Sequence, residues 1–288
     1  MAGLRFRGKT MPTDRALVMA IVNRTPDSFY DRGATFTDSE AMAAVERAVE
    51  DGADVVDIGG VKAGPGELVD VAEEVRRVVP FVAAVRERFP DLVISVDTWR
   101  HEVGRLACAA GAHLINDTWQ SADPRLAEVA AEFGAGYVCS HTGGVEPRTR
   151  PFRVRYTDVV ADVLAETTRR AAEVVALGVP AEGVLIDPAH DFGKNTWHGL
   201  ELLRRADELV AAGWPVLMAL SNKDFVGEAL GVGLEERVDG TLAATALAAH
   251  AGAAMFRAHE VRQTRHVVEM VATIAGRRPP SACIRGLA

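Results

Sequence analysis

Short apolar runs in this sequence end repeatedly in polar residues that could bind or react with a small molecule. These residues are Asn23, Asp57, Asp97, Asn116, Asp117, Asp187, Lys223, Arg257 and His259. Asp97, Asp187 and Lys223 each follow an almost uninterrupted apolar run, so we expect their charges to be part-buried and to need partners. Asp57 alone is better interpreted as a polar residue that only marks where a strand leaves the core.

The polar residues suit a ligand with two chemically different ends. A carboxylate accepts two parallel N–H donors and a carboxamide supplies a donor and an acceptor, so together they can bind an amino-substituted heterocycle. Arg257 and an imidazolium at His259 suit an anion such as phosphate. The side-chain carbonyl of Asn23 could ligate Mg²⁺. The residue types alone therefore predict an amine heterocycle that carries a phosphate.

The elements that must position these residues repeat as a strand followed by a helix. Eight apolar runs have this pattern, at 16–22, 53–58, 92–97, 113–117, 136–140, 184–187, 214–220 and 253–257. They predict an α/β fold with a single (β/α)8 TIM barrel, in which active sites lie at the carboxyl ends of the strands. A doubly wound open sheet is the alternative, weakened because no strand begins a Gly-x-Gly-x-x-Gly turn.

The boundaries expected from this pattern are a lead-in at 1–15, a barrel at 16–276 and a polar tail at 277–288. The chain has 32 basic and 40 acidic side chains, a net charge of −8, which argues against nucleic-acid binding and against an anionic membrane surface. Neither a membrane span nor a signal peptide is predicted. Three cysteines without zinc spacing indicate buried thiols in a reducing compartment, so we expect a cytoplasmic protein.

Seven motifs in the same order resemble those of dihydropteroate synthase. They lie at 23–29, 57–60, 95–98, 115–117, 187–194, 221–223 and 257–261. The resemblance covers about residues 16–275. It implies a barrel, usually a homodimer, that joins 6-hydroxymethyl-7,8-dihydropterin diphosphate to p-aminobenzoate with loss of diphosphate in folate biosynthesis. Sulfonamide and sulfone analogues of p-aminobenzoate are then expected ligands as well.

The resemblance also implies roles for individual residues. The expected pterin-binding residues are Asp97, Asn116, Asp187 and Lys223. Asn23, Arg257 and His259 would bind the diphosphate, with Asn23 as the protein ligand of Mg²⁺. The expected catalytic residues are Lys223, Arg257 and His259, because electrostatic stabilisation of the departing diphosphate carries most of the catalysis.

The resemblance fails in the region expected to bind the acceptor. The family reads Gly-Gly-Glu-Ser-Thr-Arg-Pro-Gly after the second strand, whereas residues 59–66 read Gly-Gly-Val-Lys-Ala-Gly-Pro-Gly. Lys62 can replace the lost arginine only as a point charge. A second arginine of the family is Asn222 here, and Ala189 and Asp191 replace two glycines, which stiffens that loop. The altered acceptor region comprises Lys62, Pro65, Phe192, Ser221 and Asn222.

Two functions are compatible with this pattern. One is a dihydropteroate synthase-like protein that keeps the pterin pocket and part of the diphosphate site, with weak or absent synthase activity, similar to a divergent second paralogue of actinobacteria. The alternative is an active synthase that uses p-aminobenzoate or a changed acceptor. The first is favoured, because losing one transition-state phosphate contact typically costs about 10²–10³ in rate.

Other features receive ordinary interpretations. Residues 141–144 are expected to form a glycine turn, and His190 and His198 a solvated loop and not a metal site. The arginines between 148 and 155 form a basic run, either a solvated surface or a face toward an anionic partner. The alanine-rich helix at 241–251 is apolar on more than one face, which suits a packed helix or a dimer seam.

Overall fold

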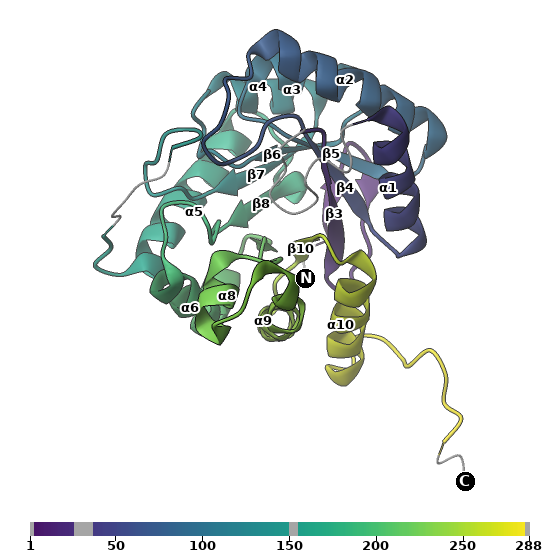
Figure 1. Ribbon diagram of the computed structural model, residues 1–288, viewed down its shortest axis with the longest axis vertical. Helices are drawn as coiled ribbons and strands as arrows, with labels where there is room; N and C mark the ends of the chain where they lie inside the picture. The colour runs from purple at the N-terminus through teal and green to yellow at the C-terminus, as the bar shows by residue number, and fades with distance from the viewer. Residues whose placement is uncertain (1–2, 26–36, 150–154, 286–288) are drawn as a thin grey trace.

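The computed structural model describes residues 3–25, 37–149 and 155–285, and its main sheet has eight parallel strands surrounded by helices (Figure 1). The strands are β3 (Leu17–Asn23), β4 (Val55–Gly59), β5 (Val93–Asp97), β6 (Leu114–Asp117), β7 (Gly136–Ser140), β8 (Val184–Asp187), β9 (Leu217–Met218) and β10 (Met255–Ala258). Motif residues 26–29, and Arg150 and Arg153 of the basic run, lie outside the described residues.

The two ends of this sheet meet, so the predicted (β/α)8 barrel is confirmed. The spatial order of the strands is β8-β7-β6-β5-β4-β3-β10-β9. A parallel bridge between Ile186 and Val216 joins the outermost strands, and the Ile186 N–H donates to the Pro215 carbonyl at 2.9 Å. Because all the strands run the same way, their carboxyl ends lie at one end of the barrel, which we call the mouth.

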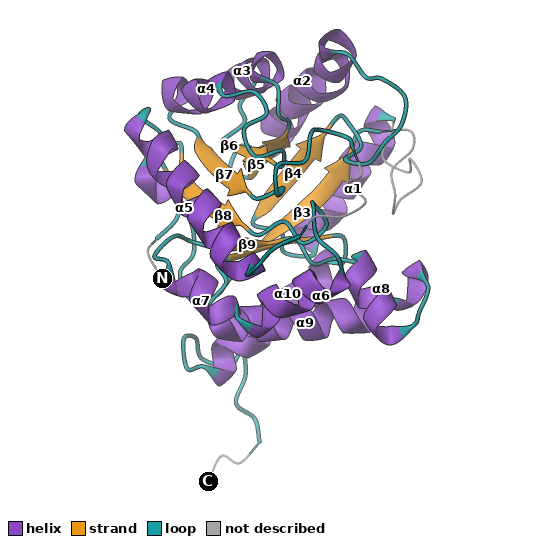
Figure 2. Ribbon diagram, turned by 90° about the vertical axis from the view of Figure 1, so that its left-hand side faces the viewer, coloured by secondary structure: helices purple, strands orange, loops and turns teal. Residues whose placement is uncertain are grey.

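Helices cover the outside of the barrel, and Figure 2 shows α2, α3 and α4 on one side of the strands with α6, α8, α9 and α10 on the other. The helices in the described residues are α1 (Asp38–Glu50), α2 (Val71–Arg88), α3 (His101–Ala109), α4 (Arg125–Phe133), α5 (Val159–Ala176), α6 (Thr196–Arg204), α7 (Ala206–Ala211), α8 (Asp224–Leu230), α9 (Val238–Ala251) and α10 (Val261–Ile274). Helix α1 begins at a residue type that favours helix starts, because the Thr37 side chain accepts from the Glu40 N–H.

Alternate residues of each strand face two different cores. In β3, Leu17 and Met19 belong to a cluster inside the barrel, whereas Val18 and Ala20 pack with residues of the surrounding helices. A hairpin of β1 (Arg5–Phe6) and β2 (Lys9–Thr10) covers the barrel interior from one end. Phe6 is fully buried there, and Gly136 leaves room for its ring.

Three elements of the structure depart from the simple pattern of one strand followed by one helix. The strand expected at 214–220 is only Leu217–Met218, since Pro215 has no N–H for a ladder. The helical segment after β8 is divided into α6 and α7 at Arg205, whose φ of −112° and ψ of 29° are not helical. Helix α8 directly follows Lys223 and was not predicted, although it ends at Gly231 in the left-handed conformation, as glycine favours.

The structure also bears on the predictions about the cysteines and about a membrane span. Cys108 and Cys139 are buried, but Cys283 is exposed on the tail that leaves the barrel after α10 (Figures 1 and 2), so the prediction of a buried thiol was wrong there. Within the described residues, no helix combines the length and the apolar character that crossing a membrane requires.

Candidate functional site

The mouth contains a polar network that joins the ends of β4, β5, β6 and β10. The Arg257 guanidinium donates through Nε to Asp57 at 2.6 Å and through its terminal nitrogen to Asp97 at 3.0 Å. Asp57 also accepts from the Ser95 hydroxyl at 2.6 Å and from the Asn116 amide at 2.9 Å. Three of the predicted site residues, Asp97, Asn116 and Arg257, are therefore brought together.

Asp57 is the centre of this network and not a strand-end marker, so that interpretation was wrong. It lies within β4, its side chain is fully buried, and it accepts three hydrogen bonds. A buried carboxylate is tolerated when a cation and other donors satisfy it. The sequence contained a signal for this burial, because Asp57 lies inside the apolar run and is followed by the apolar Ile58. Asp57 therefore positions Arg257.

Two further carboxyl groups at the mouth, those of Asp97 and Asp187, have raised pKa values. Burial, partly offset by Arg257, raises the pKa of Asp97 to about 7, although 21% of its side chain stays accessible at the rim. Burial also raises the pKa of Asp187 to about 6, opposed by a hydrogen bond from the Ala189 N–H at 2.7 Å. Both carboxyl groups therefore change protonation close to neutral pH, and a ligand that donates hydrogen bonds would favour their ionised forms.

Lys223 lies among the predicted site residues but already has an acidic partner. Its ammonium forms an ion pair with Asp191, from the loop after β8. The positive charge of Lys223 also lowers the pKa of Asp187 and of His259, so its ammonium lies near both side chains. The structure thus brings Lys223 to the mouth, in a pair that the sequence motif did not reveal.

A second polar cluster joins the ends of β9 and β10. The Ser221 hydroxyl lies 2.9 Å from His259 Nδ1 and donates to Glu260 at 3.0 Å, and the Asn222 amide donates to Glu260 at 2.8 Å. Burial lowers the pKa of His259 to about 3. The imidazolium expected at His259 was therefore wrong: the ring is neutral at pH 7 because burial and the nearby Arg257 and Lys223 disfavour the charged form.

The loop after β4, residues 60–69, is fixed by arginines from three other segments. Arg77 donates to the Gly60 carbonyl at 3.0 Å, Arg100 to the Val69 carbonyl at 2.7 Å, and Arg148 to the Glu67 carbonyl at 2.6 Å. In this loop the predicted acceptor residue Lys62 is half-buried and Pro65 is exposed. One member of the basic run, Arg148, thus anchors a loop and is not simply solvated.

Asn23 ends β3 at the mouth, directly beside Gly59 of β4. Its amide carbonyl is an uncharged ligand, whereas Mg²⁺ normally needs carboxylates or phosphates in addition. The nearby carboxylates Asp57 and Asp97 are bound to Arg257. Among the described residues, this donor set offers one neutral oxygen that is not already tied to Arg257, which does not suffice to hold Mg²⁺ by itself.

Lys194 and His141 were not predicted as site residues, although Lys194 ended a quoted motif. The ammonium of the half-buried Lys194 donates to His141 Nδ1, to the His141 carbonyl and to the Phe192 carbonyl, each at 2.9 Å. His141 Nε2 lies 2.7 Å from Asp162. The glycine turn after it is confirmed by the positive φ of Gly143 and Gly144. His141, however, is fully buried and ties the loops after β7 and β8 together.

His190 is buried and does not belong to a solvated loop, so that interpretation was wrong. Its side chain is 3% exposed, and neither ring nitrogen has a hydrogen-bond partner among the described residues. Its ring packs on Phe225 of α8 with a centroid separation of 5.6 Å. Nearby, Phe192 meets Trp119 edge to face at 4.7 Å, so this part of the rim is aromatic.

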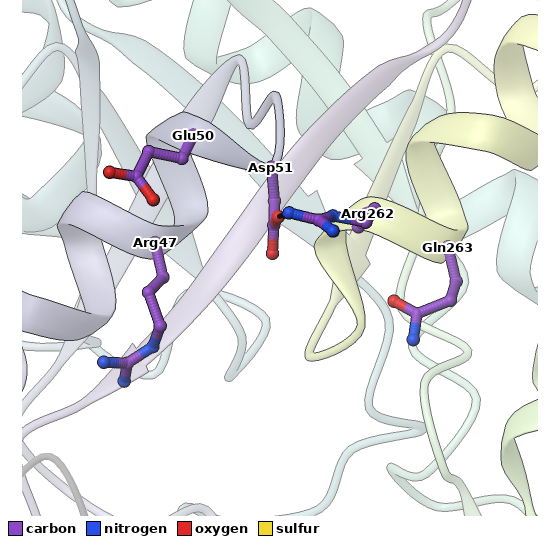
Figure 3. A pocket seen from close by; sticks show the side chains of 5 residues that line it. All are labelled: Arg47, Glu50, Asp51, Arg262 and Gln263. Carbon is purple, nitrogen blue, oxygen red and sulfur yellow. Dashed lines mark hydrogen bonds and ion pairs between the residues drawn. The ribbon is translucent and has the colours of Figure 1, made fainter.

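Two other clusters lie elsewhere. His101, Glu102 and Asp123 bring possible metal-ligating atoms within 4.8 Å of one another, but Arg125 already binds Asp123 at 3.0 Å. A surface cavity between α1 and α10 is lined by Arg47, Glu50, Asp51, Arg262 and Gln263 (Figure 3). None of the predicted site residues lines that cavity.

Comparison with known proteins identifies the family of the chain. A family model described as pterin binding enzyme matches residues 19–259. The chain belongs to the pterin-binding enzyme family. The matched span of the family includes every predicted site residue, from Asn23 to His259.

Relatives within the pterin-binding enzyme family carry two kinds of name. The chain is 66% identical over 285 residues, 98% of each chain, to a Mycobacterium leprae protein named inactive dihydropteroate synthase 2. It is 36% identical to the dihydropteroate synthase of Escherichia coli, over 92% of this chain and 94% of that protein. A solved Yersinia pestis dihydropteroate synthase with a sulfonamide drug superposes with a TM-score of 0.90 at 35% identity, over 96% of this chain and 100% of that chain.

Proposed function

We propose that this pterin-binding family member is a dihydropteroate synthase-like protein that binds a pterin at the mouth and has weak or absent synthase activity. The observation that carries the proposal is the buried network of Asp57, Arg257, Asp97 and Asn116. It leaves the Asn116 Oδ1 acceptor buried and without a partner in the described residues. A buried acceptor without a donor is costly, so a ligand N–H at that position would stabilise the site.

The proposed pterin site consists of Asp97, Asn116, Asp187 and Lys223. Asp187 offers a carboxylate to adjacent ring and amino N–H groups, which suits the parallel donors of an aminopyrimidinone. Asn116 adds its unpaired carbonyl oxygen. Arg257 keeps guanidinium donors beyond the two that bind Asp57 and Asp97, and these could grip a diphosphate together with His259 and Asn23. Mg²⁺ would arrive with the diphosphate and be held by Asn23.

Weak catalysis follows from the acceptor side. The loop after β4 lacks the hydroxyls and the arginine of the family motif, and Arg77, Arg100 and Arg148 fix its backbone. Ser221 and Asn222 both donate to Glu260, so an anionic acceptor such as p-aminobenzoate would compete with that carboxylate for the same donors. The name of the Mycobacterium leprae relative supports this proposal.

We also propose that the protein is a cytoplasmic homodimer. A homodimer through α9 and α10 is supported by Leu247, Met270 and Ile274, whose side chains are 67%, 58% and 69% exposed. We propose the cytoplasm as the compartment, and a barrel at 16–276 between a lead-in and a tail. Small molecules, including p-aminobenzoate and sulfonamides or sulfones, are the proposed ligands, and nucleic acid and membrane are not.

The deciding experiment measures binding and turnover separately. Calorimetric titration with 6-hydroxymethylpterin should show binding, while expression in a strain that lacks its synthase should not restore growth without folate end products. Restored growth would instead establish the alternative, an active synthase, which the retained Lys223, Arg257 and His259 favour. Absence of pterin binding would overturn the proposed site.

A further inference from the structure

The loop after β8, residues 188–195, forms a tight turn that aims one acidic side chain toward the mouth. The Phe192 N–H donates to the Ala189 carbonyl at 3.0 Å, and Ala189 has a φ of 47°, in the left-handed region. The Lys194 ammonium holds the carbonyls of Ala189 and Phe192 at 3.2 and 2.9 Å. The backbone oxygens of the turn therefore point to Lys194, and the Asp191 side chain is left to reach Lys223.

The same loop is seated on α8, so Asp191 is held in place. His190, the residue before it, is buried against Phe225 of α8. Asp191 and Lys223 then form an ion pair between the loop after β8 and the residue that precedes α8. Their side chains are 37% and 21% exposed, so both stay within reach of a ligand at the rim.

We propose that Asp191 is a specificity-determining residue that selects against anionic ligands by keeping the Lys223 ammonium occupied. This inference rests on the proposed function, because it requires that ligands bind at the mouth. Asp191 adds a fixed negative charge to a rim that already contains Asp97 and Asp187. Lys223 is close enough to His259, in the proposed diphosphate site, to lower the pKa of that imidazole, so a bound diphosphate would compete with the Asp191 carboxylate for the ammonium. A neutral pterin carries no such charge and can accept another N–H of the same ammonium while the pair with Asp191 persists.

The test compares two probes, 6-hydroxymethylpterin and its diphosphate, by equilibrium titration. Asp191→Asn should tighten binding of the diphosphate about fivefold, the size of an exposed ion pair, and change binding of the neutral pterin less than about twofold. Asp224→Asn is the matched control. It removes one negative charge beside Lys223 in sequence, but Asp224 pairs with Arg237, so neither affinity should change more than about twofold.

A double-mutant cycle tests whether the effect of Asp191→Asn on diphosphate binding depends on the Lys223 ammonium. In the Lys223→Met background, Asp191→Asn should lose most of its effect on the diphosphate, because the competed ammonium is gone. Equal tightening of both probes, no tightening, or an unchanged effect in the Lys223→Met background would each overturn the role of Asp191 while the pterin site stands. If no protein of the set binds either probe, the proposed function fails and this inference fails with it.

Discussion

At the scale of the residue, Arg257 shows how this mouth is built. Its guanidinium is shared between the buried Asp57 and the rim residue Asp97, so one cation satisfies two carboxylates. The Asp57 carboxylate has no access to solvent, and its stability depends on that cation and two neutral donors. Arg257 is consequently held at one position before any ligand binds, which is a form of preorganisation.

The Asp57–Arg257 pair should therefore contribute strongly to stability. Asp57→Asn leaves Arg257 without its buried partner, and breaking a buried pair of this kind costs about 3–5 kcal/mol. Urea unfolding followed by circular dichroism would measure the loss. Asp51→Asn is the control, since Asp51 pairs with Arg262, whose side chain is 66% exposed, and its loss should cost less than about 1 kcal/mol. Equal costs for the two variants would contradict the buried network.

The raised pKa of Asp187 predicts a pH dependence with a definite sign. Burial raises its folded pKa from 3.8 to about 6, so between these values the folded protein holds a proton that the unfolded chain has lost. The contribution of Asp187 to stability is then greatest below about pH 4 and falls as the pH rises to about 6. Denaturation midpoints from pH 4.5 to 7.5 should show this decline in the wild type, reduced in Asp187→Asn. Parallel curves would argue against the shift.

At the scale of the element, two loops determine what the mouth can do. The loop after β8 is locked by Lys194 and by its contact with the loop after β7, and the loop after β4 is tied down by arginines. Loops that follow strands carry the variable chemistry of this fold, while the strands provide the fixed frame. The departures from the family motifs lie in such loops, whereas Asp57, Asp97 and Asn116 lie in the strands themselves.

Close packing of the loop after β8 against the loop after β7 should make any side chain at Gly193 destabilising. Its φ is 63°, and a Cβ added there would lie 2.2 Å from the Thr142 carbonyl oxygen. Gly193→Ala should therefore lower stability by about 3 kcal/mol, through strain and a steric clash. Gly231→Ala is the matched control: its φ is 69° but no atom lies within 4 Å of the added Cβ. It should cost only about 1 kcal/mol in the same thermal unfolding assay.

The loop after β4 provides a test of lost activity. Replacing Lys62, Ala63 and Gly64 with serine, threonine and arginine restores three residues of the family motif. Gly64 is not among the positive-φ glycines, so the backbone accepts a side chain there. Synthase turnover should rise at least about tenfold, since one phosphate contact is typically worth about 10²–10³ in rate. The variant without Gly64→Arg serves as control. No gain would place the defect in Asn222, Ala189 or Asp191.

At the scale of the whole molecule, the barrel separates stability from binding. Its interior cluster is apolar and closed at one end by the hairpin of β1 and β2, while the titratable residues gather at the mouth. The outer wall is covered by helices, and α9 and α10 pack side by side. Exposed apolar residues on these two helices form the surface that we propose for dimerisation.

The proposed dimer makes a prediction about assembly. The wild type should sediment as a dimer, and Leu247→Lys combined with Met270→Lys should sediment as a monomer, because charged side chains in an apolar interface are costly. Leu68→Lys is the control, since Leu68 is 89% exposed in the loop after β4 and should leave the dimer intact. Sedimentation velocity distinguishes the three proteins. A monomeric wild type would refute the dimer.

The sequence by itself determined the repeated unit and the identity of the mouth residues. Eight apolar runs, three of which carry Asp97, Asn116 and Asp187 at their ends, were enough to predict eight parallel strands, because buried parallel strands need continuous apolar runs and their carboxyl ends share one face. Helix ends such as Thr37 were also predictable, since a cap depends on neighbours three residues away. Local rules are readable in sequence because the interacting groups are close along the chain.

Only the tertiary structure decided which of these residues bind one another. Asp57 and Arg257 are 200 positions apart, and the pair forms because β10 lies beside β3 and β3 beside β4. The Asp191 contact with Lys223 and the burial of His190 depend likewise on how one loop is seated on α8. Pairing and burial are properties of distances in space, and both pKa values and ligand access follow from them.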